Sequence, residues 1–347
     1  MRATAEWESF SEWVETQTPD VICLQEVKLA AYGSISSVKG DGKPRDRGKI
    51  KDNTKSAIPD ADIVRQKLQR KPFSQYQQFW SLSDWRYSGV LVLVRKPIKV
   101  LKTRFNLDPD RPASEHHPDG RVVVLQFPNV DFVGTYAPNH GWEPGHWQRR
   151  EEWDNVCLNY LIRRQERIDG TKKEERAEQN KREVGGEAGA EEEGKPLLWM
   201  GDLNVAPTDF DLTHPAWFKV QVQRGFGRGT AETEVPPECL GQPGCTPVER
   251  ENFASLLSQG HMTDVWRHFN PEGPPPSDRT SSGPGLVSPS RGGGAGDVAN
   301  SCLWDVETAH WTWRGTPGNL TPEAGKYYSK AMRIDHAVSR QKVGEKV

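Results

Sequence analysis

Acidic and amide side chains follow several short apolar segments of this sequence. Glu26 ends "DVICLQE", Asp202 and Asn204 follow the apolar run 197–200, and Asp335 ends "MRID". Side chains alternate along an extended chain, so Asp202 and Asn204 are predicted to share one face. Oxygen ligands of this kind suit Mg²⁺, a hard cation that keeps several waters. They also suit phosphoryl chemistry, which needs neutralised charge on oxygen and a positioned water.

Each of these positions alone has an ordinary structural interpretation. Glu26 by itself is more typical of a solvated strand end, and short polar residues after a strand are common in turns. Tyr136 and Asn139 follow a further strand-like segment, "DFVGTY". Because open α/β sheets bind ligands at the carboxyl ends of their strands, several polar strand ends together favour a functional site.

Composition excludes some classes of protein and leaves others open. The chain has 347 residues, 34% of them hydrophobic, with thirteen tryptophans, and the mean hydropathy is -0.77. The net charge of -2 gives no global signature of nucleic-acid binding, although a local basic rim is compatible with it. Five scattered cysteines form no C-x-x-C pair, which argues against zinc. The sequence has no apolar run that would span a membrane and no signal-peptide pattern, so an intracellular protein is expected.

Apolar periodicity predicts alternating strands and helices. Helices are expected over 7–14 and 153–161, and from a capping box at Thr246, Pro247 and Glu249. Strands are expected at 21–24, 89–94, 121–127 and 131–138, the last two joined by the turn "PNVD". This order predicts a layered α/β architecture in a single domain spanning 1–347.

Three stretches interrupt the apolar pattern. Residues 32–60 are rich in Gly, Ser, Lys and Asp, and residues 165–195 are almost entirely Glu, Lys, Arg, Gly and Ala. Residues 271–300 are rich in Gly, Pro and Ser. Such compositions bury too little apolar surface to fold alone, so three disordered insertions are predicted.

Nine short motifs occur in one order along the chain and together carry a family resemblance. They are "LQEVK", "YSGVLVL", "DGRVV", "TYAPNHG", "GDLNVAPTDFDL", "CTPVERENFASLL", "TDVWRHFNP", "WTWRG" and "MRID". The set closely resembles the exodeoxyribonuclease III family of apurinic/apyrimidinic (AP) endonucleases, within the endonuclease/exonuclease/phosphatase superfamily. This resemblance implies a four-layer α/β/β/α sandwich. It also implies Mg²⁺-dependent hydrolysis of DNA 5′ to abasic sites in base-excision repair, with Mn²⁺ as an alternative ion and a possible 3′-5′ exonuclease activity.

The resemblance also implies roles for the polar residues at the strand ends. Glu26 resembles the metal-binding glutamate, and Asp202 the aspartate that orients or deprotonates the attacking water. Asn204, Tyr136 and Asn139 are similar to residues that contact the scissile phosphate.

Five further positions are assigned roles through the same resemblance. Asp335 looks like the aspartate that orients a catalytic histidine. Trp313 and Met332 match the wall of a pocket for the flipped abasic sugar, although Met332 replaces a larger residue. Lys28 and Arg121 are candidates for a basic rim on the DNA-binding face, with an exposed structural cation as the alternative for each.

The sequence departs from the family pattern at both ends. The asparagine-bearing first strand is expected to be missing before Met1, and no final strand with an "SDH" motif precedes Val347. His336 follows Asp335 directly, so in a strand it is expected to point to the opposite face. His116 and His117 are interpreted as ordinary polar loop residues. An incomplete gene prediction and a degenerate paralogue both fit this pattern.

Three functions remain open from the sequence. The first is the DNA-repair phosphodiesterase, acting as a nuclear monomer. The second is a catalytically impaired nucleic-acid-binding paralogue, and the third is a superfamily phosphoesterase acting on a phospholipid or an inositol phosphate. The "TPVER" and "DFDL" matches favour the DNA-repair branch over the third.

Overall fold

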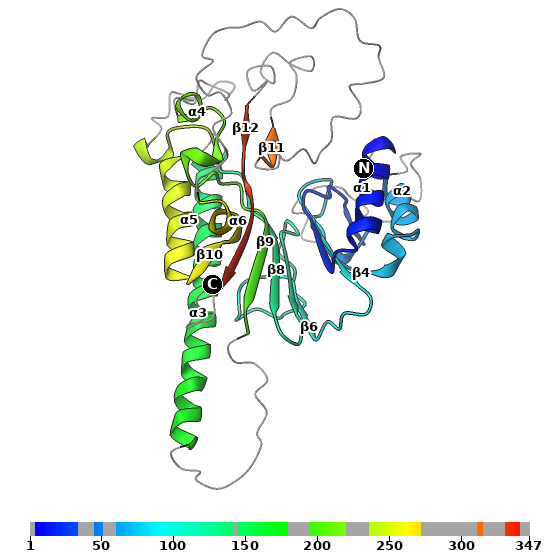
Figure 1. Cartoon of the computed structure of the whole chain (residues 1–347), viewed down its shortest axis with the longest axis horizontal. Coiled ribbons are helices and arrows are strands. Elements are labelled where there is room, and N and C mark those ends of the chain that lie inside the picture. Colours follow the sequence, from blue (N-terminus) through cyan, green and yellow to red (C-terminus); the bar gives the residue numbers. More distant parts are fainter. Residues whose placement is uncertain are drawn as a thin grey trace, which may run out of the picture.

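Two β-sheets lie between two layers of helices (Figure 1). The computed structural model describes residues 4–33, 45–50, 60–141, 144–179, 195–219, 236–271, 311–314 and 330–340. The smaller sheet has the order β1 (Val21–Leu24), β5 (Val90–Arg95) and β4 (Tyr76–Ser81), and both of its pairings are antiparallel.

The larger sheet carries six strands in the described residues. Their order is β10 (Met262–Asp264), β13 (Asp335–Arg340), β9 (Leu197–Asp202), β8 (Asp131–Tyr136), β7 (Val122–Gln126) and β6 (Lys102–Arg104). The β8–β9 pair is parallel, whereas the other four pairs are antiparallel. Two small ribbons pair β2 (Ala31–Tyr32) with β3 (Asp46–Ile50), and β11 (Trp313–Arg314) with β12 (Ala331–Met332).

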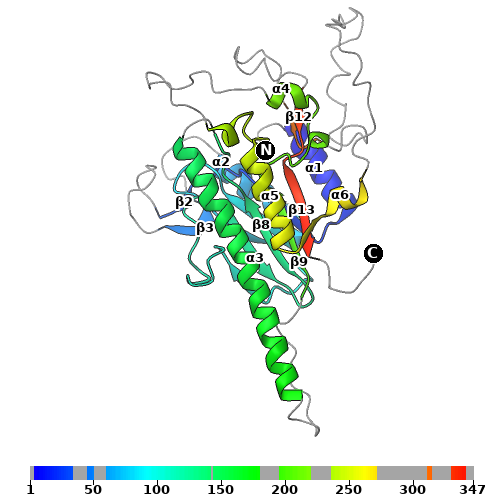
Figure 2. The same ribbon diagram turned by 90° about the vertical axis from the view of Figure 1, so that its left-hand side faces the viewer.

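The helices cover the outer face of each sheet. Helices α1 (Thr4–Gln17) and α2 (Asp60–Leu68) pack on the smaller sheet. Helices α3 (Pro144–Gln179) and α5 (Pro247–Gln259) run side by side over the larger one (Figure 2). Two short helices, α4 (Pro215–Lys219) and α6 (Val265–Phe269), complete the described set. In the described part of the chain, no helix is both long enough and apolar enough to cross a membrane.

Three apolar cores separate the four layers, and β5 shows how the sequence builds two of them. Leu91 and Leu93 pack with α1 and α2, whereas Val90, Val92 and Val94 face the larger sheet. A strand that is buried on both faces must be apolar at every position, which explains the continuous run in this segment. The predicted α/β/β/α sandwich is confirmed.

Two of the predicted insertions are partly ordered. In the stretch 32–60, β3 pairs with β2 instead of remaining irregular. Helix α3 continues to Gln179, past the predicted start of the charged insertion at residue 165. The error there has a physical reason, because Glu, Lys, Arg and Ala are strong helix formers and a solvated helix needs no apolar face. The predicted insertion 271–300 lies outside the described residues after residue 271.

The amino end of α5 forms the predicted capping box. Thr246 is the N-cap and Pro247 opens the helix, while the Thr246 hydroxyl lies 3.4 Å from the Glu249 amide nitrogen, whose hydrogen it accepts. The Glu249 carboxylate accepts from the Thr246 amide at 3.1 Å and from its hydroxyl at 2.7 Å. Both groups are buried, so this cap also fixes a loop that leads towards the polar strand ends.

Candidate active site

Three carboxylates from distant parts of the chain face one another at one end of the two sheets. Asp202 ends β9, and Asp335 begins β13 directly opposite it in the antiparallel register. Glu26 follows β1 in the other sheet. Burial raises the pKa of Asp202 well above its ordinary value of 3.8, and the charges of Asp335 and Glu26 raise it further. Burial likewise raises the pKa of Asp335, against a hydrogen bond from Thr312. The three carboxylates therefore disfavour one another's ionised forms.

Tyr136 joins this cluster from the end of β8. Its hydroxyl donates to Glu26 Oε1 at 2.6 Å, and the ring is buried. Burial, and then the Glu26 carboxylate, raise the pKa of the phenol, so Tyr136 is a neutral hydrogen-bond donor. Arg121 stands behind it, 4.9 Å from the ring centroid, and donates to the Tyr136 carbonyl oxygen at 3.0 Å.

The Asp202 and Asn204 pair does not have the extended geometry that alternation predicts. Asn204 has a φ of 49° in the left-handed region, and its amide N–H donates to Asp202 Oδ1 at 2.8 Å. This turn follows from the ability of Asp and Asn side chains to bond nearby backbone and tolerate positive φ. It brings the Asn204 side chain to the Ala137 carbonyl, at 2.8 Å, and to Asn139 Nδ2, at 3.4 Å. The two asparagines therefore meet beside Asp202.

Gly201 allows β9 to approach β8 at this point. Its φ is 147°, and a Cβ placed there would lie 1.9 Å from the Thr135 carbonyl oxygen. Any side chain would therefore push the two strands apart. Position 201 therefore requires glycine, because β8 and β9 lie too close together there for a side chain. The same strand pairing places Asp202 next to Tyr136.

The carboxylate cluster fits a divalent cation that is bound mainly through water. Within the described ranges, no group of three or more His, Cys, Asp or Glu residues is placed to hold a metal ion by itself. However, the mutual repulsion of Glu26, Asp202 and Asp335 is the electrostatic environment that a cation relieves. Glu26 is half-exposed, and its Oε2 pairs with the half-exposed Lys28 ammonium at 3.0 Å. Since Mg²⁺ in proteins keeps several waters, Glu26 is the residue that would hold it.

The two candidates for a basic rim differ in their surroundings. Lys28 is half-exposed and pairs with Glu26, so it lies at the carboxylate cluster itself. The side chain of Arg121 is only 3% exposed and bonds Asp119, Tyr87 and the Tyr136 carbonyl. Arg121 is therefore not part of an exposed rim, and this expectation is corrected. Its guanidinium holds Tyr136 in place, because its N–H groups donate at the same time to the Asp119 carboxylate, the Tyr87 hydroxyl and the Tyr136 carbonyl.

The two residues predicted to form the wall of a sugar pocket lie together in the β11–β12 ribbon. The β11–β12 ribbon sets Trp313 opposite Met332, as the resemblance implies. However, Met332 is 3% exposed and packs in an apolar cluster with Leu212 and Phe218. Burial of this degree does not exclude a place in a pocket wall, so the role predicted for Met332 stays a prediction. Trp313 is half-buried at the edge of the same cluster.

His336 points away from Asp335, as strand alternation predicts. It is buried against Phe253, and its Nε2 lies 2.7 Å from the Val205 carbonyl oxygen, to which it donates. Its Nδ1 lies 3.1 Å from Arg333 Nη1 and accepts from it. His336 is thus engaged on the opposite face of β13 and does not join the carboxylate cluster.

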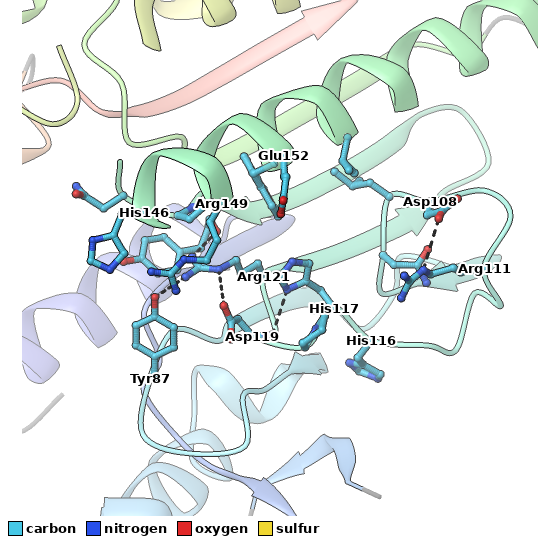
Figure 3. Close-up of a pocket in the computed structure, with 18 of the residues that line it drawn as sticks. Tyr87, Asp108, Arg111, His116, His117, Asp119, Arg121, His146, Arg149 and Glu152 are labelled. Atoms are coloured by element: carbon cyan, nitrogen blue, oxygen red, sulfur yellow. Dashed lines mark hydrogen bonds and ion pairs between the residues drawn. The ribbon is translucent and has the colours of Figure 1, made fainter. Parts of the chain in front are cut away.

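A cavity of about 730 Å³ adjoins the cluster and was not expected from the sequence (Figure 3). Tyr136 and Asn139 stand in its wall together with His116 and His117. Both histidines line the cavity, and burial lowers the pKa of each to about 4. No sequence pattern could have predicted this position, because the loop that carries His116 and His117 meets α3 only in the folded protein.

The carboxylate cluster is expected to make the stability of the fold depend on pH and on Mg²⁺. With a chelator present, the free energy of unfolding should fall as pH rises above 3.8, the ordinary pKa of an aspartate. The raised pKa values of Asp202 and Asp335 mean that the folded state keeps protons which the unfolded state has already released. Millimolar Mg²⁺ should raise Tm, and more so at pH 8 than at pH 5. Thermal melts across this range test the prediction. An identical Tm with and without Mg²⁺ at every pH would contradict it.

Comparison with known proteins agrees with the fold and the motif order. The model of the Endonuclease/Exonuclease/phosphatase family matches residues 8–219. A DNA-(apurinic or apyrimidinic site) endonuclease of Arabidopsis thaliana is 30% identical over 351 residues, covering 100% of this chain and 74% of the relative. An enzyme of the same name from Plasmodium falciparum (isolate 3D7) is 35% identical over 272 residues, covering 76% of this chain and 38% of the relative.

A solved structure agrees with the fold alone. The AP endonuclease of Leishmania major has a TM-score of 0.51 and 17% identity, over 97% of this chain and 74% of that one. The family model covers more than half of the chain, and the Arabidopsis relative aligns along all of it. The chain therefore belongs to the endonuclease/exonuclease/phosphatase family, in the branch of AP endonucleases related to exodeoxyribonuclease III.

Proposed function

We propose that this protein is a DNA phosphodiesterase of base-excision repair that cleaves 5′ to abasic sites with Mg²⁺ or Mn²⁺. The observation that carries the proposal is the meeting of Glu26, Asp202 and Asp335 with the neutral donor Tyr136 and two asparagine amides. This set offers acid oxygens for a cation, a base for water and donors for a phosphate. The names of the relatives supply the substrate, DNA with an abasic site.

We infer a part of the reaction for each group. The Tyr136 hydroxyl, which donates to Glu26 in this structure, would turn to a non-bridging oxygen of the phosphate, and the Asn139 and Asn204 amides would donate to the phosphate with their second N–H groups. Asp202 accepts a proton from the attacking water, since burial raises its pKa and so makes its ionised carboxylate a stronger base than an exposed one. Water adds to phosphorus as the bond to the 3′ oxygen breaks; the phosphate stays on the abasic sugar, and the 3′ oxygen takes up a proton from solvent and leaves as a 3′-hydroxyl. A divalent cation at Glu26 would neutralise charge on the phosphate.

An incision assay tests the activity. A duplex with one abasic site should be cut on the damaged strand in Mg²⁺, and neither an undamaged duplex nor the same duplex in EDTA should be cut. Salt-dependent binding without turnover would instead identify a DNA-binding relative. Hydrolysis of an inositol phosphate or phospholipid, with no cleavage of DNA, would identify another type of phosphoesterase.

Tyr136→Phe is expected to lower kcat for incision about 10- to 100-fold, because it removes the single O–H that donates to Glu26 in this structure and would donate to the phosphate in the complex. Tyr76→Phe is the matched control. Tyr76 is also a buried tyrosine, but its hydroxyl donates to the Pro19 carbonyl in another part of the protein. Steady-state kinetics on the abasic duplex separate the two. Equal kcat for both variants would exclude Tyr136 from the reaction.

The proposal extends to three properties that are carried over from the family. These are removal of nucleotides from 3′ ends, action as a monomer and residence in the nucleus. Digestion of a labelled recessed 3′ end, sedimentation of the purified chain and imaging of a tagged copy in cells address them in turn. Cleavage of abasic sites without digestion of 3′ ends would limit the function to incision.

A further inference from the structure

The cavity beside the carboxylate cluster is larger than the proposed chemistry needs. Its wall comes from the segment 106–121, the first turns of α3 and the Trp85–Tyr87 pair. Tyr136 and Asn139 belong both to this wall and to the group that would bind the scissile phosphate. A nucleotide next to that phosphate is therefore adjacent to the cavity. Its volume of about 730 Å³ lies in the range of pockets that bind small organic ligands.

Flat aromatic surfaces form part of the wall. Trp85 is 37% exposed and stacks on Tyr87, with ring centroids 5.4 Å apart. Trp153 of α3 lies under the cavity and contacts the His117 ring edge-on at 5.6 Å. Surfaces of this kind bind unpaired nucleic-acid bases by stacking, whatever their sequence.

His117 supplies a directional donor inside the cavity. Its Nδ1 accepts the Asp119 amide N–H at 3.1 Å, so the proton of the neutral ring lies on Nε2. Burial lowers the pKa of His117 to about 4, which keeps the ring neutral at pH 7. Within the described residues, Nε2 has no hydrogen-bond partner. A neutral N–H group in an aromatic cavity matches the carbonyl oxygens and ring nitrogens of a base.

Arg149 supplies a charge at the other end. Its Nε donates to the Gly145 carbonyl at 3.1 Å, and it forms no ion pair within the part of the chain that the structure describes. Figure 3 shows Arg149, Arg121, His146 and Tyr87 gathered at one end of the cavity, with His117 further along. A nucleotide with its phosphate near Arg149 would have its base towards His117.

We propose that this cavity is a subsite for an unpaired base of the cleaved strand, next to the scissile phosphate. The inference rests on the proposed function and narrows its substrate class. Abasic sites whose neighbouring base is extrahelical or mismatched would be bound more tightly than sites with a paired neighbour, because an unpaired base reaches the cavity without the cost of breaking a base pair.

The test uses the full chain in EDTA and two abasic duplexes that carry a fluorescent base analogue, 2-aminopurine. The analogue is left unpaired directly 5′ to the abasic site in one duplex and directly 3′ to it in the other. Stacking in the cavity should quench the fluorescence in at least one of them. Val156→Trp should abolish the quenching and weaken binding of that duplex about tenfold. Val156 lines the cavity from α3 and is 43% exposed, so the larger side chain fills the cavity without entering the core.

Two further variants complete the experiment. Asn155→Trp adds the same side chain at an exposed position of α3 that does not line the cavity, and it should behave as the wild type. His117→Gln keeps a polar side chain and should reduce quenching by a smaller factor. No quenching by the wild type, or equal quenching by Val156→Trp and Asn155→Trp, would overturn the base subsite.

The base subsite and the proposed function can fail separately. Incision of a fully paired abasic duplex in Mg²⁺, without quenching in EDTA, would retain the activity and overturn the subsite. Quenching that Val156→Trp abolishes, without incision by the wild type, would retain the subsite in a DNA-binding protein and overturn the activity.

Discussion

Asp202→Asn is expected to lower kcat for incision of abasic DNA about 100- to 10,000-fold, the usual range for loss of a general base. The substitution keeps the local geometry, because an amide oxygen still accepts the Asn204 amide N–H that Asp202 Oδ1 accepts at 2.8 Å. What is lost is the proton affinity of the side chain. KM should change little, since the phosphate donors Tyr136 and Asn139 are untouched.

The same substitution is expected to raise Tm in chelator at pH 8. Burial and the nearby Asp335 and Glu26 charges raise the pKa of Asp202, which means that its ionised form destabilises the folded state. Above its folded pKa, the neutral amide removes this repulsion. Asp62→Asn is the control, because Asp62 is exposed and its ion pair with Arg65 lies on the surface of α2. An Asp202→Asn protein with full activity, or with a lower Tm than the control, would contradict the assignment.

Local sequence patterns predicted the layers of the fold and one end of a helix. The β5 run is apolar at every position because both of its faces are buried, and that signal needs no knowledge of its neighbours. The α5 cap depends on Thr246 and Glu249, three residues apart, so the sequence contains all of its interaction. Predictions of this kind succeed because their physical cause lies within a few residues.

The geometry of the site depends on contacts between distant segments, and there the sequence was less informative. The resemblance named Asp202 and Asp335, but only the β9–β13 register shows that they face each other. Alternation failed at Asn204 because an Asx turn ends the extended strand. Arginine is a residue type that often lies on a basic surface, so the sequence favoured an exposed position for Arg121. Its burial depends on contacts with the Tyr87 and Tyr136 rings, which only the structure shows.

A buried ion network links the two asparagine loops of the site to α3 and α5. Arg150 Nη1 donates to the Pro138 carbonyl at 3.1 Å and to the Asn204 carbonyl at 3.2 Å. Its Nε bonds the Asp154 carboxylate at 2.9 Å, and the Glu249 carboxylate lies 3.9 Å away. Burial alone would lower the pKa of Arg150, but Asp154 and Glu249 outweigh it, so the guanidinium stays charged.

Arg150→Met is expected to lower the free energy of unfolding by about 3–5 kcal/mol, because two carboxylates lose their counter-charge and two buried carbonyls lose a hydrogen-bond donor. Urea unfolding measures this loss. Arg163→Met on the same helix is the matched control and should resemble the wild type, since the Arg163–Asp110 pair is exposed. Adding Glu249→Gln should restore part of the stability lost in Arg150→Met, because it removes one of the two unpaired charges. Additive losses in the double variant would show that the two residues are not coupled. Arg150 would then hold the asparagine loops through its carbonyl contacts and its Asp154 pair, without Glu249.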